Sequence, residues 1–198
     1  MMVFYDAGLV LLSVPKTGTT ALQDALRPKA DLVLSGPPEL KHSPLYRYNR
    51  WIRPMFEKVC GAELEVAAVM REPVDWLGSW YRYRQRKSLI GRPTSTLGIS
   101  FDQYVQDYCQ GQRPPHANVG SQAKFLAAQP NGCRVHHLFA YDRLSAYHAF
   151  IQARLGIEIE TQPRNVSPTA DLSLSDGTLQ KLKRKHPEEF ALYHSIPG

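Results

Sequence analysis

The residues best suited to chemistry form a short turn close to the start of the chain. They read Val14-Pro15-Lys16-Thr17-Gly18-Thr19-Thr20. An apolar run precedes the turn and a helical pattern follows it, so its backbone N–H groups can face an anion at the start of a helix. Gly18 permits close approach of a ligand, Lys16 supplies a mobile positive charge, and the threonines offer hydroxyl donors. The turn therefore predicts an anion-binding loop; an ordinary threonine-capped strand-to-helix turn is the alternative.

A nucleotide-hydrolysing P-loop is the first competitor for this turn. That loop has the pattern G-x-x-x-x-G-K-[ST], in which the lysine directly follows the second glycine, whereas Lys16 precedes Gly18 by two positions. An apolar run at residues 64–70 also ends in Arg71, where such an enzyme needs a magnesium-binding aspartate. Both departures point away from metal-dependent hydrolysis. A metal-dependent kinase or NTPase stays open as an alternative.

A second segment changes the interpretation of the loop. Residues 69–84 read VMREPVDWLGSWYRYR, and together with residues 14–20 they resemble the sulfotransferases that use 3′-phosphoadenosine 5′-phosphosulfate (PAPS). The resemblance implies that the loop binds the 5′-phosphosulfate. It also implies that Arg71, at the end of a strand, and Ser79, eight residues later, hold the 3′-phosphate. Arginine suits that task because its planar fork can bond two phosphate oxygens at once.

The resemblance is not even along the chain. It is firm from Gly8 to Arg84, whereas residues 118–127 (NVGSQAKFLA) and 138–144 (LFAYDRL) look similar only to bacterial members of the family. It implies PAPS as the co-substrate and a reaction that needs no metal ion. Structural alternatives exist for both residues. The arginine can form an ion pair with a neighbouring carboxylate, and Ser79 can lie on a helix surface.

Sulfuryl transfer also needs a base to take the proton of the acceptor. Residues 40–45 read LKHSPL and are similar to the Lys-Thr-His-Leu-Pro segment of the cytosolic sulfotransferases, with one residue absent between lysine and histidine. We therefore expect His42 to be the general base and Lys16 to neutralise charge on the departing phosphate. Histidine, with an ordinary pKa of about 6.5, suits this role near neutral pH. Glu39 is the alternative, because relatives that act on polysaccharides use a glutamate; a non-catalytic His42 also stays open.

These residues need a scaffold, and the apolar runs predict one. Four strands are expected near residues 8–14, 31–34, 64–70 and 134–140, and helical patterns lie between and after them. Strands that alternate with helices predict an α/β fold of three layers, with a central parallel sheet of about four or five strands. The resemblance implies kinship with the P-loop nucleotide kinases. We expect a single domain over residues 1–198, with residues 89–118 as a lid on the acceptor side.

Composition limits the classes of protein and partner. The chain has 198 residues, a net charge of +6 and three cysteines, Cys60, Cys109 and Cys133. Its length fits one domain, and its charge favours an anionic ligand. The sparse cysteines predict reduced thiols and a cytoplasmic protein. Residues 1–14 fit a buried first strand better than a signal peptide, and no apolar run is long enough to span a membrane.

Two further features do not define a partner. A basic cluster combines arginine and lysine with interleaved tyrosines: Tyr81, Arg82, Tyr83, Arg84, Arg86 and Lys87. The cluster can attract PAPS or an anionic acceptor, bind nucleic acid, or form a solvated helix end. We expect no nucleic acid as a partner. A non-catalytic module that binds an anion or nucleic acid stays open as an alternative function of the protein. Asn165-Val166-Ser167 matches a glycosylation pattern and receives no role. The acceptor, a hydroxyl or less readily an amine on a small molecule, carbohydrate or lipid, is not identified, nor is the oligomeric state.

Overall fold

The computed structural model describes residues 1–159 and 168–197, so the Asn165-Val166-Ser167 pattern lies outside the described residues. Within them the chain forms two compact units, each assembled from separate stretches of the sequence. The first unit holds residues 1–71, 122–159 and 196–197, and the second holds residues 72–121 and 168–195. The expectation of a single domain stays a prediction, and the two units are described one at a time below.

A mixed sheet forms the centre of the first unit. In the described residues it has five strands: β1 (Met2–Phe4), β2 (Leu9–Leu11), β3 (Leu32–Val33), β4 (Glu65–Met70) and β5 (His137–Ala140). Their order is β3-β1-β2-β4-β5, with β2, β4 and β5 paired in parallel and β1 antiparallel to both β2 and β3. The four strands that the sequence predicts therefore run in one direction. The α/β class is confirmed, and the prediction of a wholly parallel sheet is wrong.

The antiparallel strand arises from a hairpin at the N-terminal end of the sequence. The apolar run of the first fourteen residues is interrupted at residues 5–8, where the Gly8 N–H donates to the Tyr5 carbonyl at 2.9 Å. Gly8 has a φ of +60°, a conformation that glycine adopts without a steric penalty. The turn folds β1 back onto β2, so what the sequence presents as one strand is two.

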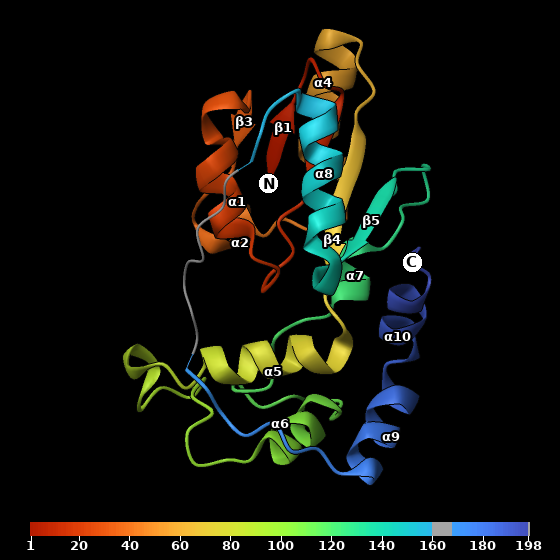
Figure 1. Cartoon of the computed structure of the whole chain (residues 1–198). Helices are drawn as coiled ribbons and strands as arrows, with labels where there is room; N and C mark the ends of the chain where they lie inside the picture. Colours follow the sequence, from red (N-terminus) through yellow and green to blue (C-terminus); the bar gives the residue numbers. More distant parts are fainter. Residues whose placement is uncertain (160–167, 198) are drawn as a thin grey trace. The chain divides into compact units, whose positions relative to one another are not determined.

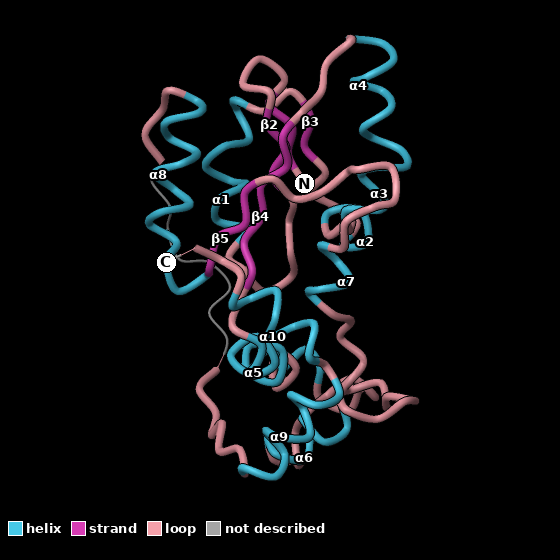
Figure 2. Tube along the Cα trace, turned by 90° about the vertical axis from the view of Figure 1, so that its right-hand side faces the viewer, coloured by secondary structure: helices cyan, strands magenta, loops and turns pink. Residues whose placement is uncertain are grey.

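Helices cover both faces of this sheet (Figure 2). The helices of the first unit are α1 (Thr19–Leu26), α2 (Pro38–Lys41), α3 (Leu45–Arg47), α4 (Arg53–Cys60), α7 (Gln122–Leu126) and α8 (Leu144–Leu155). Three shorter turns join them: η1 (Arg27–Lys29), η2 (Tyr48–Ile52), which is π-helical, and η4 (Tyr141–Arg143). Figure 2 shows α1 and α8 on one side of the strands and α3, α4 and α7 on the other. The layered arrangement expected from the sequence is thus present in this unit.

The continuous burial of residues along the strands explains why two helical layers are needed. Leu9 and Leu11 of β2 pack in one cluster with Leu22 of α1 and Ile151 of α8. The intervening Val10 is also fully buried. Because successive side chains of a strand point to opposite faces, both faces of the sheet are apolar and both are covered.

The second unit is helical in its described residues. It contains α5 (Pro73–Tyr83), η3 (Lys87–Leu89), α6 (Phe101–Tyr108), α9 (Asp176–Lys185) and α10 (Pro187–His194). These helices are drawn in yellow, green and blue in Figure 1. Their core is rich in aromatic residues: Trp76, Tyr81, Phe101, Tyr104, Tyr108 and Phe190. Residues 89–118 thus supply core residues of this unit through α6, and their expected role as a lid stays a prediction.

The basic cluster separates into buried and surface residues. Arg84 is buried, with Nη1 and Nη2 donating to the Pro115 and Asn118 carbonyls at 2.6 and 3.3 Å, while Lys87 is exposed. The buried guanidinium fastens the segment after α6 to the end of α5. Arg84 therefore holds this unit together and is not part of a continuous surface patch.

Candidate functional site

The loop between β2 and α1 has an unusual backbone conformation. Lys16 has a φ of +70° and is the only residue other than glycine with a positive φ in the described chain; Gly18 follows with a φ of +73°. A left-handed conformation costs an L-residue about 1–2 kcal/mol, and strain of this kind concentrates at functional sites. The Thr17 hydroxyl donates to the Val14 carbonyl at 2.9 Å and so closes the loop internally.

The start of α1 has the features of an anion site. Gly18 is its N-cap, and in the described structure no side chain caps the helix. Helices leave their first N–H groups without intrahelical partners, and the helix dipole adds positive potential there. The first turn of α1 contains no acidic residue, so no carboxylate of its own caps the helix. The geometry therefore fits an external anion at this position.

Arg71, directly after β4, is brought to the same loop. Its Nη1 donates to the Lys16 carbonyl at 3.2 Å, and its guanidinium carbon lies 4.3 Å from the centre of the Tyr141 ring. The Gln122 side chain brackets its backbone: the Arg71 N–H donates to Oε1 at 3.0 Å, and Nε2 donates to the Arg71 carbonyl at 2.9 Å. Gln122 and Tyr141 thus fix both the backbone and the side chain of the arginine.

Neither of these two supporting residues was singled out from the sequence. They lie in the two segments that look similar to bacterial sulfotransferases, residues 118–127 and 138–144. That similarity was the available signal, but it did not indicate which residue contacts Arg71. The contacts join positions 51 residues apart or more, so no local pattern reports them.

His42 also approaches the loop. Its Nδ1 lies 2.7 Å from the Ser13 carbonyl oxygen. A carbonyl can only accept, so Nδ1 carries the proton and Nε2 keeps a lone pair in the neutral ring. Burial lowers the pKa of His42 below its ordinary value, and the nearby charges of Lys41 and Lys16 lower it further against the opposing hydrogen bond to Ser13. The ring is therefore neutral at pH 7 and can accept a proton.

Lys41 adds a second positive charge beside the helix start. Its Nζ donates to the Thr20 hydroxyl oxygen at 2.8 Å, and burial lowers the pKa of its amine. Glu39, by contrast, is exposed on α2, and its carbonyl rather than its side chain accepts a hydrogen bond, from Arg47. Among the two candidate bases, His42 is the one in direct contact with the loop.

Ser79 belongs to a different unit from the residues above. It lies on α5 in the second unit and is buried. Its predicted partnership with Arg71 at a 3′-phosphate therefore stays a prediction from the sequence.

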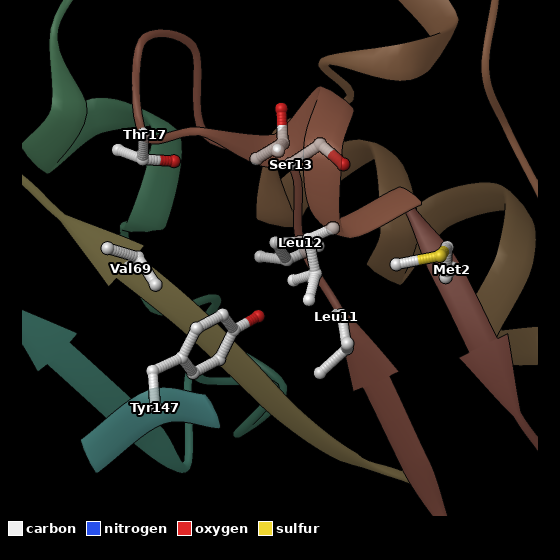
Figure 3. A pocket seen from close by; sticks show the side chains of 9 residues that line it. Met2, Leu11, Leu12, Ser13, Thr17, Val69 and Tyr147 are labelled. Atoms are coloured by element: carbon white, nitrogen blue, oxygen red, sulfur yellow. The ribbon is translucent and has the colours of Figure 1, made fainter. Parts of the chain in front are cut away.

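A small cavity lies under the loop, as Figure 3 shows. It is lined by residues of β1, β2, α1, β4 and α8 and by residues 12, 13 and 17 of the loop, and the Tyr147 ring reaches toward it. Its volume of about 10 Å³ is close to the minimum for one water molecule. Burial raises the pKa of Tyr147, so its hydroxyl stays neutral. This cavity is too small to hold a nucleotide.

Comparison with known proteins adds no family to this description. Neither the protein-family models nor the curated proteins contain a match to the chain. The functional argument therefore depends on the residues themselves.

Proposed function

We propose that the protein transfers a sulfuryl group from PAPS to an acceptor hydroxyl, or less readily an amine. One observation carries most of the weight: Arg71 and His42, which come from two separate parts of the chain, both contact backbone carbonyls of the loop at residues 13–18, the loop that carries Lys16. The motif resemblance predicts this convergence, and the geometry supports it. The α/β sheet with helices on both faces is also compatible with kinship to the P-loop nucleotide kinases, which we retain as part of the proposal.

The residues of the loop suit the two negatively charged ends of PAPS. The uncapped start of α1, with the Lys16 ammonium, would hold the 5′-phosphosulfate. Arg71 and, by the resemblance, Ser79 would hold the 3′-phosphate. A reader of the 3′-phosphate distinguishes PAPS from ATP, since ATP has no charge there. This distinction separates the proposal from a kinase or NTPase.

The transfer itself can be written with every atom accounted for. The acceptor oxygen attacks the sulfur in line with the bond between sulfur and the bridging oxygen, which breaks. The sulfuryl group moves to the acceptor, and adenosine 3′,5′-bisphosphate departs with the electrons of the broken bond. His42 Nε2 takes the acceptor proton, and Lys16 stabilises the charge on the departing phosphate.

Turnover with labelled donor tests this proposal. PAPS carrying ³⁵S is incubated with panels of phenols, sugars and lipids, and both labelled product and released bisphosphate are measured. The wild type should form the two in equal amounts, whereas His42→Ala should form neither. Hydrolysis of ATP with magnesium, while PAPS stays intact, would instead identify a kinase or NTPase. Binding of oligonucleotides without turnover of either nucleotide would identify the non-catalytic module.

A further inference from the structure

Large apolar side chains are exposed along one helical segment of the first unit. Residues 45–60 form α3, η2 and α4 without interruption. Of the eight large hydrophobic side chains that are exposed in the described residues, four belong to this segment: Tyr46 (44%), Trp51 (57%), Met55 (45%) and Val59 (79%). We refer to these four residues as the apolar line. Poor packing of the segment does not explain their exposure, because the segment also has a buried side.

The opposite side of the segment is firmly packed. Leu45, Tyr48 and Phe56 are buried, at 0%, 1% and 8% exposure. The Phe56 ring also stacks on Tyr5, with ring centres 6.3 Å apart. The segment is thus fixed to the body of the unit by one side and presents the apolar line on another.

The π-helical turn is what aligns the apolar line. Its members are spaced by five, four and four residues. In a regular α-helix, residues five apart point about 140° away from each other. Hydrogen bonds from residue i to i+5 in a π turn bring residues five apart closer to the same side; Trp51 lies within η2 (Tyr48–Ile52), which begins two residues after Tyr46. Wide turns of this kind are frequent at functional sites, which makes the alignment informative.

The segment that carries the apolar line has an excess of positive charge. The segment has four basic residues, Arg47, Arg50, Arg53 and Lys58, against one acidic residue, Glu57, which pairs with Arg53. The guanidinium groups of Arg47 and Arg50 lie over the Tyr46 and Trp51 rings, at 5.7 and 5.8 Å from the ring centres. The segment therefore offers two exposed aromatic rings with guanidinium groups over them, two further exposed apolar side chains, and a net positive charge.

We propose that this segment is a docking surface for an anionic membrane. Tryptophan and tyrosine favour the interface of a bilayer, Met55 and Val59 can enter its outer acyl region, and the arginines can bond lipid phosphates. No helix in the described part of the chain has the length and apolarity to cross a membrane. In the proposed contact the segment lies parallel to the bilayer, with the apolar line toward the lipid.

Other occupants fit the surface less well. A second copy of the chain, packed through the same surface, would bring two sets of arginines together, which is unfavourable. A nucleic acid would use the cations and the rings but leave Met55 and Val59 without an apolar partner. Anionic lipid is the partner whose chemistry matches every part of the surface. The proposal does not depend on the sulfotransferase function.

Sedimentation with vesicles tests the proposal. Vesicles of phosphatidylcholine with about 30% phosphatidylserine should bind the wild type, and vesicles of phosphatidylcholine alone should bind it far less. The variant Trp51→Ser/Met55→Ser should lose affinity by about tenfold or more. The matched control Ile90→Ser/Leu97→Ser removes two other exposed side chains, in the second unit, and should bind as the wild type does.

Two further measurements separate loss of contact from loss of fold. Arg50→Glu keeps the apolar line, so its defect should appear with anionic vesicles and diminish at high salt. Brominated lipids should quench Trp51 fluorescence, seen as the difference between the wild type and Trp51→Phe. Circular dichroism should be unchanged in all variants, because the altered side chains are exposed.

Three results would overturn the proposal. The first is that the wild type does not sediment with anionic vesicles, and the second is that Trp51→Ser/Met55→Ser binds them as well as the wild type. The third is a dimer in solution that dissociates in that variant, because the apolar line would then contact a second copy of the chain. Binding of an oligonucleotide through Arg50, without any binding to anionic vesicles, would also overturn the proposal, because the surface would then recognise nucleic acid.

Discussion

The guanidinium of Arg71 is held from two directions. The Lys16 carbonyl accepts from Nη1, and the Tyr141 ring covers one face of the group. Guanidinium has five N–H donors in a rigid fork, so an arginine placed in this way can also bond a phosphate. Its positive charge next to the loop is the residue-scale basis of the proposed specificity for a 3′-phosphorylated nucleotide.

Replacing this arginine should therefore weaken binding of adenosine 3′,5′-bisphosphate. We expect Arg71→Ala to raise the dissociation constant by more than about tenfold, the cost of losing a charge-assisted contact. Arg71→Lys should restore little, because lysine cannot bond two oxygens at once. Calorimetric titration measures both, with the exposed Arg92→Ala as the control. Equal affinities of Arg71→Ala and the control would remove Arg71 from the site.

The protonation of His42 gives a second prediction at this scale. Because burial is the main cause that lowers its pKa, its NMR titration should have a midpoint below the ordinary value of about 6.5. Lys41→Met should move this midpoint upward, since it removes a positive charge, whereas Lys29→Met, at an exposed site, should not. Turnover should persist below pH 6.5 and fall as the pH drops through the midpoint, where the base becomes protonated. A midpoint above 6.5 would contradict this account.

At the scale of the element, the loop from β2 to α1 combines backbone strain with its proposed role in anion binding. Lys16→Ala and Lys16→Gly both remove the ammonium, so both should bind the bisphosphate less tightly than the wild type. They should differ in stability, because only glycine adopts a φ of +70° without a steric penalty. We expect the glycine variant to have a free energy of unfolding about 1 kcal/mol higher than the alanine variant. Denaturant unfolding measures the difference, and equal stabilities would show that the loop relaxes in the variants.

In the second unit, the basic residues divide by role. Arg84→Ala should lower the free energy of unfolding by about 2–4 kcal/mol, because it leaves two carbonyls, of Pro115 and Asn118, without their donor. Lys87→Ala, at an exposed position, should change it by less than about 0.5 kcal/mol. Thermal unfolding compares the two. A stable Arg84→Ala variant would mean that these hydrogen bonds contribute little.

The elements also show which features a sequence can reveal. Apolar runs identify β2 and β4 because strands inside a sheet that is covered on both faces require continuous hydrophobicity. The hairpin of β1 and β2 was missed because the residues of its turn sit within a largely apolar stretch. The π turn of η2 leaves no mark in residue types, since it depends on packing and not on propensity.

At the scale of the whole molecule, the candidate site also contains residues that the sequence predicts and residues that it does not. That Arg71 lies beside the loop could be predicted, because the proposed anion site restricts residue types at fixed spacing. Gln122 and Tyr141 could not, because any residue that supports the arginine from a distant part of the chain would serve, and only the fold brings these two near it. Long-range support of this kind is a property of the tertiary structure.

The protein as a whole, with its net charge of +6, attracts anions of many kinds, so charge alone does not define its ligand. Selectivity among phosphorylated ligands defines the ligand. Calorimetric titration of the wild type with adenosine 3′,5′-bisphosphate, ATP with magnesium and a short oligonucleotide compares them directly. We expect the bisphosphate to bind with a dissociation constant below about 1 mM and more tightly than either competitor. Absence of heat from the bisphosphate at that concentration, or tighter binding of ATP with magnesium, would contradict the proposed function.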